Sequence, residues 1–407
     1  MNKIAKNTIW LFGSQVFAKV IGFFYVLYLT RTLGVEKFGQ YEAVLAFIFI
    51  FFTLVDFGLN RLLIRDVSRR VKEAGVFLGN VLGLRLGLSV IAYGLSLIFA
   101  SVLGYSFSTV YLIALSSLVF FSQGLWFCFE AIFMALEKFQ ICAFGTAILA
   151  ILNPILGIIL LKAGFGVAGV LTGMLFSSLA VLFYFGLLTK AQNISWRFTF
   201  GREKALYFLK EGLGFAFLTS LSIVYLKNGM VVLSRLGNEE AVGLYAAAYK
   251  IVEVGILFPN ALAMAFFPQV SRLILTNKKG LSRLYFKSVL GAFLLALPLA
   301  IIVNLYPKQI LGLLFGQEFV PAAPAFSVLG FSLILFFVNA LPGNIIQSWG
   351  KLTSFLPWAL FNTVLNIFLN LFLIPRFSLL GVAYAMLITE ATGFIINNIF
   401  VVKILRG

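Results

Sequence analysis

The chain has 407 residues, of which 61% are apolar, 16% are aromatic and only 11% are charged. A water-soluble domain carries about 25% charged residues, so this composition excludes a water-soluble fold and is typical of an integral membrane protein. The net charge is +17, and the chain contains two cysteines and no histidine. A structural zinc site, a Cys–His nucleophile pair and a Ser–His–Asp triad would each lack a required member.

Roughly twelve apolar runs are long enough to cross a bilayer, which takes about 20 residues for about 30 Å of hydrocarbon. They cover residues 8–29, 41–63, 81–103, 109–134, 141–161, 167–189, 212–234, 241–270, 285–304, 323–347, 353–374 and 380–402. The first run is too long for the core of a signal peptide, so we expect it to remain as a span. The sequence therefore predicts an all-α membrane protein of about twelve transmembrane helices.

The basic residues lie in short clusters between the spans, which argues against nucleic acid as a partner. If the N-terminus is cytoplasmic, 22 basic residues fall on the cytoplasmic side and six on the opposite side. The positive-inside rule then predicts a multi-pass protein of the cytoplasmic (inner) membrane with both termini in the cytoplasm.

Two motifs occur twice and in the same order. LGVEKFGQYEA (33–43) is repeated as LGNEEAVGLYAA (236–247), and GVLTGML (169–175) is repeated as GVAYAML (381–387). We interpret these repeats as a duplication joined in the polar stretch 190–204.

The predicted halves are 1–195 and 196–407, each with six helices. Because each half has an even number of spans, both enter the membrane in the same direction, as parallel repeats. Transporters with this plan bind substrate between their halves, so we expect a central cavity surrounded by two six-helix lobes.

Charged residues also lie inside the predicted spans. They are Lys19, Asp56, Lys227, Lys250, Glu253 and Glu390. A charge at the centre of a span costs about 2.5–3.5 kcal/mol when it faces lipid, so these groups should face protein or water. The three lysines predict an electropositive cavity that binds a phosphate group, since an ammonium is a compact charge with three donors. Alternatively the lysines neutralise nearby carboxylates, Lys250 with Glu253 on one helix face and Lys19 with Asp56.

The carboxylates Asp56, Glu253 and Glu390 are candidates for coupling to a proton or sodium gradient, since carboxylates at membrane depth are typical of ion pathways. With no histidine in the chain, proton coupling would depend on them. Glu42 and Arg85 lie nearer the ends of spans, where we expect long side chains to reach the membrane interface.

Asparagines form a polar stripe on the eleventh span. Asn362, Asn366 and Asn370 recur every fourth residue, and Asn153 is the repeat equivalent of Asn366. They are expected to fasten helices to one another by hydrogen bonds. The alternative is that they line the cavity and bind sugar hydroxyls.

Five segments spread over the chain carry a family resemblance. They are YLTRTLGVEKFGQY (28–41), VDFGLNRLLIRDVSR (55–69), GLYAAAYKI (243–251), ILGLLFGQEFVPAAPAFSVL (310–329) and NIFLNLFLIPRFSLLGVAYAMLITE (366–390). Together they resemble the polysaccharide-transport branch of the multidrug/oligosaccharidyl-lipid/polysaccharide (MOP) exporter superfamily, whose members share the MATE-like fold.

The resemblance implies a flippase that moves an oligosaccharide linked to polyprenyl diphosphate across the membrane by alternating access. It implies no cofactor, and its expected partners are the lipid-linked oligosaccharide, membrane lipids and other proteins of polysaccharide assembly. An anionic diphosphate agrees with the lysines found inside the spans.

Two other functions are alternatives to the flippase. A cation-coupled multidrug antiporter of the same superfamily would favour acidic groups in its cavity. A membrane glycan polymerase or ligase would need a long outer loop or an acid/base cluster, whereas only 305–322 is long and Glu318 is its one acid. We therefore expect a transporter and not an enzyme, with no catalytic and no metal-binding residues.

Overall fold

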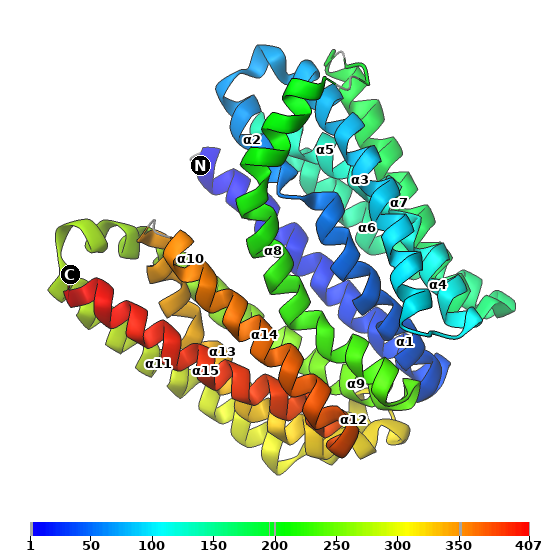
Figure 1. Cartoon of the computed structure of the whole chain (residues 1–407), viewed down its shortest axis with the longest axis vertical. Helices are drawn as coiled ribbons and strands as arrows, with labels where there is room; N and C mark the ends of the chain where they lie inside the picture. The colour runs from blue at the N-terminus through cyan, green and yellow to red at the C-terminus, as the bar shows by residue number, and fades with distance from the viewer. Residues whose placement is uncertain (1–2, 195, 199–200, 350–351, 407) are drawn as a thin grey trace. The chain divides into compact units, whose positions relative to one another are not determined.

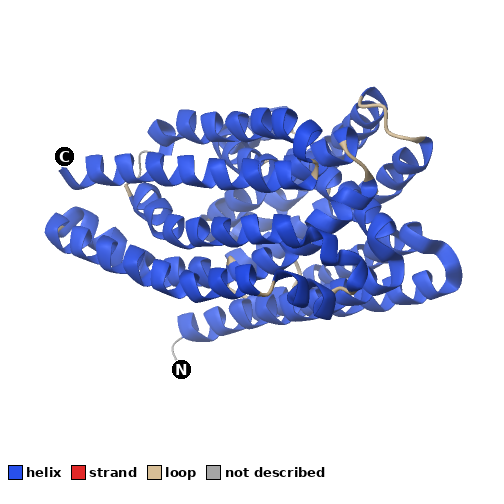
Figure 2. Cartoon of the chain, turned by 90° about the horizontal axis from the view of Figure 1, so that it is seen from below, coloured by secondary structure: helices blue, strands red, loops and turns tan. Residues whose placement is uncertain are grey.

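The computed structural model describes residues 3–194, 196–198, 201–349 and 352–406, and in these ranges the regular structure is helical (Figures 1 and 2). The helices are α1 (Lys3–Asp56), α2 (Leu59–Arg69), η1 (Val71–Glu73), α3 (Ala74–Val102), α4 (Phe107–Ser117), α5 (Val119–Ala135), α6 (Phe139–Leu160), the π-turn η2 (Leu161–Phe165), α7 (Gly166–Ala191), α8 (Arg202–Leu236), α9 (Glu239–Gly255), α10 (Leu257–Thr276), α11 (Lys278–Leu305), α12 (Pro307–Leu314), η3 (Gln317–Ala322), α13 (Ala323–Ser348), α14 (Leu352–Phe377) and α15 (Leu379–Arg406). Ten helical segments of this described part are long and apolar enough to cross a membrane. The predicted all-α, multi-pass membrane protein is confirmed.

Two of the ten segments are much longer than one span. Helix α1 has 54 residues, which at 1.5 Å per residue is about 80 Å and far exceeds a hydrocarbon layer of about 30 Å. It is interrupted at Gly34, where φ is 72°, and the segment that joins α6 to α7 is interrupted at Gly164, where φ is 91°. Glycine adopts such positive φ angles without a steric penalty. Counting each of these segments as two spans is consistent with the predicted twelve.

The chain forms two compact units, which are described separately. Unit 1 contains residues 1–33 and 44–227, and its core forms where α5 packs against α2, α3 and α7. Helix α2 is amphipathic because Leu59, Leu62 and Leu63 share one face, and all three are 0% exposed. This apolar face fixes α2 on unit 1 and leaves its basic face outward.

Unit 2 contains residues 34–43 and 228–407. Helix α13 is central to it, because α9, α10, α11 and α15 all pack against α13. The predicted long outer loop 305–322 is occupied by α12 and η3, which pack on each other. The predicted halves 1–195 and 196–407 concern the duplication of the sequence and stay a prediction.

Candidate functional site

The break between α1 and α2 brings together a buried ion pair in unit 1. Phe57 and Gly58 adopt left-handed backbone angles at this break, with φ of 41° and 70°. Arg85, on α3, has a 0% exposed side chain, and its Nη2 lies 2.9 Å from Oδ1 of Asp56. The same guanidinium donates to the carbonyl oxygens of Val55 at 3.2 Å and Asp56 at 3.3 Å. Arg85 therefore both neutralises Asp56 and satisfies the carbonyl groups that end α1.

The prediction that Arg85 reaches the membrane interface is wrong. Its remaining hydrogen bonds also stay inside unit 1, to Oδ1 of Asn60 at 2.9 Å, to the carbonyl oxygen of Gly124 at 3.0 Å and to Sγ of Cys128 at 3.4 Å. A buried guanidinium is stable only with such a complete set of acceptors. The alternative pairing of Lys19 with Asp56 is not formed, since Arg85 takes this carboxylate.

Two in-span lysines lie in unit 1 and differ in their surroundings. Lys19 follows Ile9, the start of the apolar segment of α1, by ten residues, which places it about 15 Å along the span. Its side chain is exposed, and no described residue forms an ion pair or hydrogen bond with it. The Nζ of Lys227 lies 5.8 Å from the ring centre of Phe49, in a cation–π contact.

The third in-span lysine, Lys250, lies between two carboxylates of unit 2. Its Nζ is 3.2 Å from Oε1 of Glu42 and 3.6 Å from Oε2 of Glu253, which confirms the pairing of Lys250 with Glu253 on one face of α9. The prediction that Glu42 reaches the interface is wrong, because Glu42 is only 2% exposed and is neutralised by Lys250. Two carboxylates and one ammonium leave a formal charge of −1, so Lys250 carries no uncompensated positive charge here.

A contact between the two copies of the repeated motif holds Glu42 in unit 2. A Cβ atom built on Gly39 would lie 1.7 Å from the carbonyl oxygen of Glu239, and one built on Gly243 would lie 2.1 Å from that of Val35. Gly39 and Gly243 occupy the same position in the motif, as do Val35 and Glu239, so the contact is symmetric. Only glycine permits backbones this close. The repeat places glycine at the same position in both copies, which was a signal in the sequence, but the contact itself was not predicted.

Glu390 accepts a hydrogen bond inside unit 2. It lies on α15, is 8% exposed, and its Oε2 accepts a hydrogen bond from Nδ2 of Asn339 on α13 at 3.0 Å. The same amide donates to the carbonyl oxygen of Glu390 at 3.2 Å, and Oδ1 of Asn339 accepts from Asn397 at 3.4 Å. The amide group of Asn339 thus helps to fix the carboxylate of Glu390 on α15.

The asparagine stripe divides into two parts. Asn366 and Asn370 are 2% and 1% exposed, and both bond to Asn228 of α8 at 2.8 Å. Asn366 also donates to Thr389 of α15 at 3.0 Å, so the amides join three helices as expected for interhelical fastening. Asn228 was not predicted as part of this network, although a polar residue beside Lys227 within an apolar span was a signal.

Asn362 and Asn153 behave differently from these two. Each buries an amide Oδ1 that accepts no hydrogen bond from any described residue. Their predicted role in binding sugar hydroxyls stays a prediction, and so do the substrate and ion-coupling roles of the in-span charges.

Solved structures with a similar architecture identify the fold of this chain. A lipid II flippase, MurJ, superposes with a TM-score of 0.80 at 16% identity, over 98% of this chain and 89% of that one. A multidrug resistance MATE family transporter of the MOP superfamily superposes with a TM-score of 0.74 at 18% identity, over 94% of this chain and 95% of that one. The chain has the fold of MOP-superfamily membrane transporters, as predicted.

The sequence comparisons then give the family. The model of the polysaccharide biosynthesis protein family matches residues 4–274, and the MatE model matches residues 213–372. Because the first match covers more than half of the chain, this protein belongs to the polysaccharide biosynthesis protein family.

Several curated relatives span nearly the whole chain. A Shigella flexneri protein named as a candidate O-antigen transporter is 28% identical over 93% of both chains. Agl15 of Haloferax volcanii, named as a candidate flippase of low-salt glycan biosynthesis, is 23% identical over 97% of this chain and 82% of its own. The capsular polysaccharide biosynthesis protein CapF of Staphylococcus aureus is 22% identical over 96% of this chain and 98% of its own.

Proposed function

We propose that this protein is a flippase that moves an oligosaccharide linked to polyprenyl diphosphate across the cytoplasmic membrane, with both termini in the cytoplasm. Family membership and relatives named for O-antigen transport and glycan flipping support this substrate class. The same names favour a transporter over a glycan polymerase or ligase. Transport is proposed to follow alternating access, with other proteins of polysaccharide assembly as partners.

The observation that carries the substrate assignment is the charge of Lys19, which has no ion-pair or hydrogen-bond partner among the described residues. An ammonium at this depth costs about 2.5–3.5 kcal/mol if it faces lipid, so it needs water or an anion, and the described residues of unit 1 provide no such anion. A diphosphate would provide that anion, and a lysine can follow a moving phosphate because its stem is flexible. Among the three predicted cavity cations, Lys19 is therefore the one that we assign to the diphosphate first.

The other predicted site residues enter the proposal with secondary roles. Lys250 is held by two carboxylates, so it would contribute to phosphate binding only after one of them has moved away. Lys227 remains a predicted second cation. Coupling to protons or sodium is proposed through Glu253 or Glu390, since the carboxylate of Asp56 forms an ion pair with Arg85.

A cation-coupled multidrug antiporter is the second candidate function. The MatE model matches residues 213–372, and three of the buried or half-buried carboxylates, Glu42, Glu253 and Glu390, belong to unit 2. Acidic groups of this kind would attract a cationic drug. This candidate predicts exchange of a cationic dye for protons.

The test uses the purified protein in liposomes that carry a fluorescent polyprenyl-diphosphate oligosaccharide. The fraction of the label that crosses the bilayer is measured with a membrane-impermeant quencher. Wild type is compared with Lys19→Ala, Lys19→Arg and the control Lys162→Ala, whose exposed lysine lies on the turn between α6 and α7. We expect transport by wild type and by the control, a loss of at least about tenfold in Lys19→Ala, and partial retention in Lys19→Arg, which keeps the charge.

Two results would contradict the proposal. If wild type moves no lipid-linked oligosaccharide but exchanges a cationic dye for protons, the antiporter is correct. If Lys19→Ala transports as fast as Lys162→Ala, the diphosphate is bound by other groups and the assignment of Lys19 fails.

A further inference from the structure

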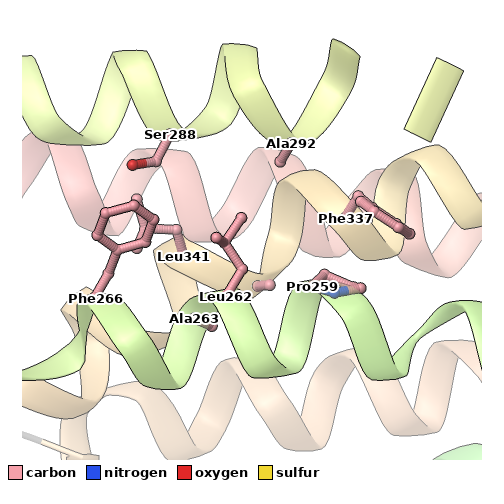
Figure 3. A pocket seen from close by; sticks show the side chains of 9 residues that line it. Pro259, Leu262, Ala263, Phe266, Ser288, Ala292, Phe337 and Leu341 are labelled. Carbon is pink, nitrogen blue, oxygen red and sulfur yellow. The ribbon is translucent and has the colours of Figure 1, made fainter. Parts of the chain in front are cut away.

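A small apolar pocket lies in unit 2 between α10, α11 and α13, and Figure 3 shows the side chains that line it. Phe266 and Ser288 lie at one end of it, and Pro259 and Ala292 lie toward the other end. Its lining is apolar except for the hydroxyl group of Ser288. The pocket has an empty volume of about 230 Å³ with its open side included, so it suits a short stretch of a hydrocarbon chain rather than a whole one.

The pocket forms because α10 and α11 both pack on α13 and not tightly on each other. Nδ2 of Asn344, on α13, donates to the carbonyl oxygen of Ala263 on α10. Further along the same helices, the hydroxyl groups of Ser271 and Ser348 lie 3.1 Å apart. Among the described side chains, none of α10 hydrogen-bonds to α11, and the small pocket lies where these two helices meet α13.

A cluster of five basic residues lies beyond the Phe266 and Ser288 end of the pocket, at the turn between α10 and α11. The members are Arg272, Lys278, Lys279, Arg283 and Lys287, all exposed. Arg272 follows Phe266 by six residues and Arg283 precedes Ser288 by five, which places both within about 7–9 Å of the pocket end along their helices. Side chains of this length can reach a group bound at the pocket mouth.

This cluster contains no acidic residue. The sequence has no aspartate or glutamate between Glu253 and Glu318, and none of the five cations forms an ion pair in the described part of the chain. The basic residues around α2 are different, because Arg65 lies 2.9 Å from Asp66 and 3.4 Å from Glu211. Orientation in the membrane needs basic residues on one side but does not require the exclusion of acids. The uncompensated cluster is what an anionic ligand would neutralise.

We propose that α10, α11 and α13 form a binding site for one anionic membrane phospholipid. Its phosphate lies against the basic cluster, and a short stretch of one acyl chain occupies the apolar pocket. Basic pockets between transmembrane helices on the cytoplasmic side bind anionic lipid head groups, and this turn is on the side predicted to be cytoplasmic. Ser288 lines the pocket and its hydroxyl has no hydrogen-bond partner among the described residues, so it would face the ester carbonyl groups of the bound lipid. The site is independent of what the protein transports.

The test uses the full-length protein in phosphatidylcholine liposomes with a photoactivatable lipid that carries a diazirine in one acyl chain. Phosphatidylglycerol and phosphatidylcholine with the same labelled chain are compared, and labelled peptides are identified by mass spectrometry. We expect phosphatidylglycerol to label peptides of α10 and α11, and phosphatidylcholine to label them weakly. Since each basic residue near an anionic surface contributes about fivefold in binding, Lys278→Gln/Lys279→Gln/Arg283→Gln should weaken this labelling roughly a hundredfold.

Two further variants separate charge from the pocket. Arg61→Gln/Arg69→Gln/Lys72→Gln removes three exposed cations of unit 1 and should leave the labelling of α10 and α11 unchanged. Ala292→Leu keeps the basic cluster but fills the pocket, because Ala292 is a lining residue. In this variant the phosphate should still bind while the diazirine labels other peptides.

Three results would overturn the proposal. Equal labelling by the two phospholipids would show that the site does not select an anionic lipid. Unchanged labelling in the α10–α11 variant would exclude the basic cluster as the phosphate site. Labelling by a diazirine polyprenyl diphosphate, without any by phosphatidylglycerol, would assign the pocket to the transported substrate instead.

Discussion

Replacing Arg85 by methionine should destabilise unit 1 locally. Methionine keeps the aliphatic volume of the side chain but removes a guanidinium that is 0% exposed and bonded to the Asp56 carboxylate. Removing one partner of a buried ion pair costs about 3–5 kcal/mol. The Asp56 side chain is 23% exposed and can recover some solvation, so we expect the lower end, about 3 kcal/mol.

The thiol of Cys128 reports on this region. Cys128 is 0% exposed and lies 3.4 Å from Nη1 of Arg85, and Cys142, the second cysteine, can be replaced by alanine. When local opening is fast, the rate of maleimide labelling follows the population of the open form. A loss of about 3 kcal/mol should therefore accelerate labelling by about two orders of magnitude.

A double variant separates the charge from the packing. Asp56→Leu combined with Arg85→Met leaves no uncompensated buried charge, so labelling of Cys128 should return most of the way to the parent rate. If Cys128 in Arg85→Met is labelled at a rate within about threefold of the parent rate, the ion pair does not stabilise the break between α1 and α2. Equally fast labelling in the single and double variants would assign the loss to the uncapped carbonyl groups rather than to charge.

Two other perturbations test the contacts of unit 2. Gly39→Ala places a Cβ 1.7 Å from the carbonyl oxygen of Glu239, so we expect little folded protein by size-exclusion chromatography, whereas Gly22→Ala, with nothing within 4 Å, should behave as wild type. Lys250→Ala leaves the 2% exposed Glu42 without its cation and should lower the free energy of unfolding by about 3 kcal/mol, measured by thermal unfolding in detergent. Glu42→Gln/Lys250→Gln should recover much of this loss, and equal stability of wild type and Lys250→Ala would show that the pair contributes nothing.

The proposed lipid site and the proposed transport site depend on different residues. Substrate transport depends on Lys19 in unit 1, whereas phospholipid binding depends on the turn between α10 and α11 in unit 2. A result that contradicts one of these two proposals therefore does not contradict the other. Because the basic cluster is exposed, its glutamine variants should fold normally and can be used in both assays.

The fold class could be predicted from the sequence alone. A chain with 61% apolar residues in runs of about 20 has no other stable arrangement than membrane-spanning helices. The sequence also indicated the polysaccharide-transport resemblance and the pairing of Lys250 with Glu253, since residues three apart on a helix are neighbours whatever the tertiary structure.

The partners of the remaining buried charges can be identified only from the tertiary structure. Arg85 and Glu42 look like interfacial residues in the sequence, since they lie near span ends. They are buried because their partners come from segments 29 and 208 positions away. Such pairings depend on how helices pack, and no local pattern encodes them. The same holds for the contact of Gly39 with Gly243, and for the pocket of α10, α11 and α13, which exists only because two helices share a third as their support.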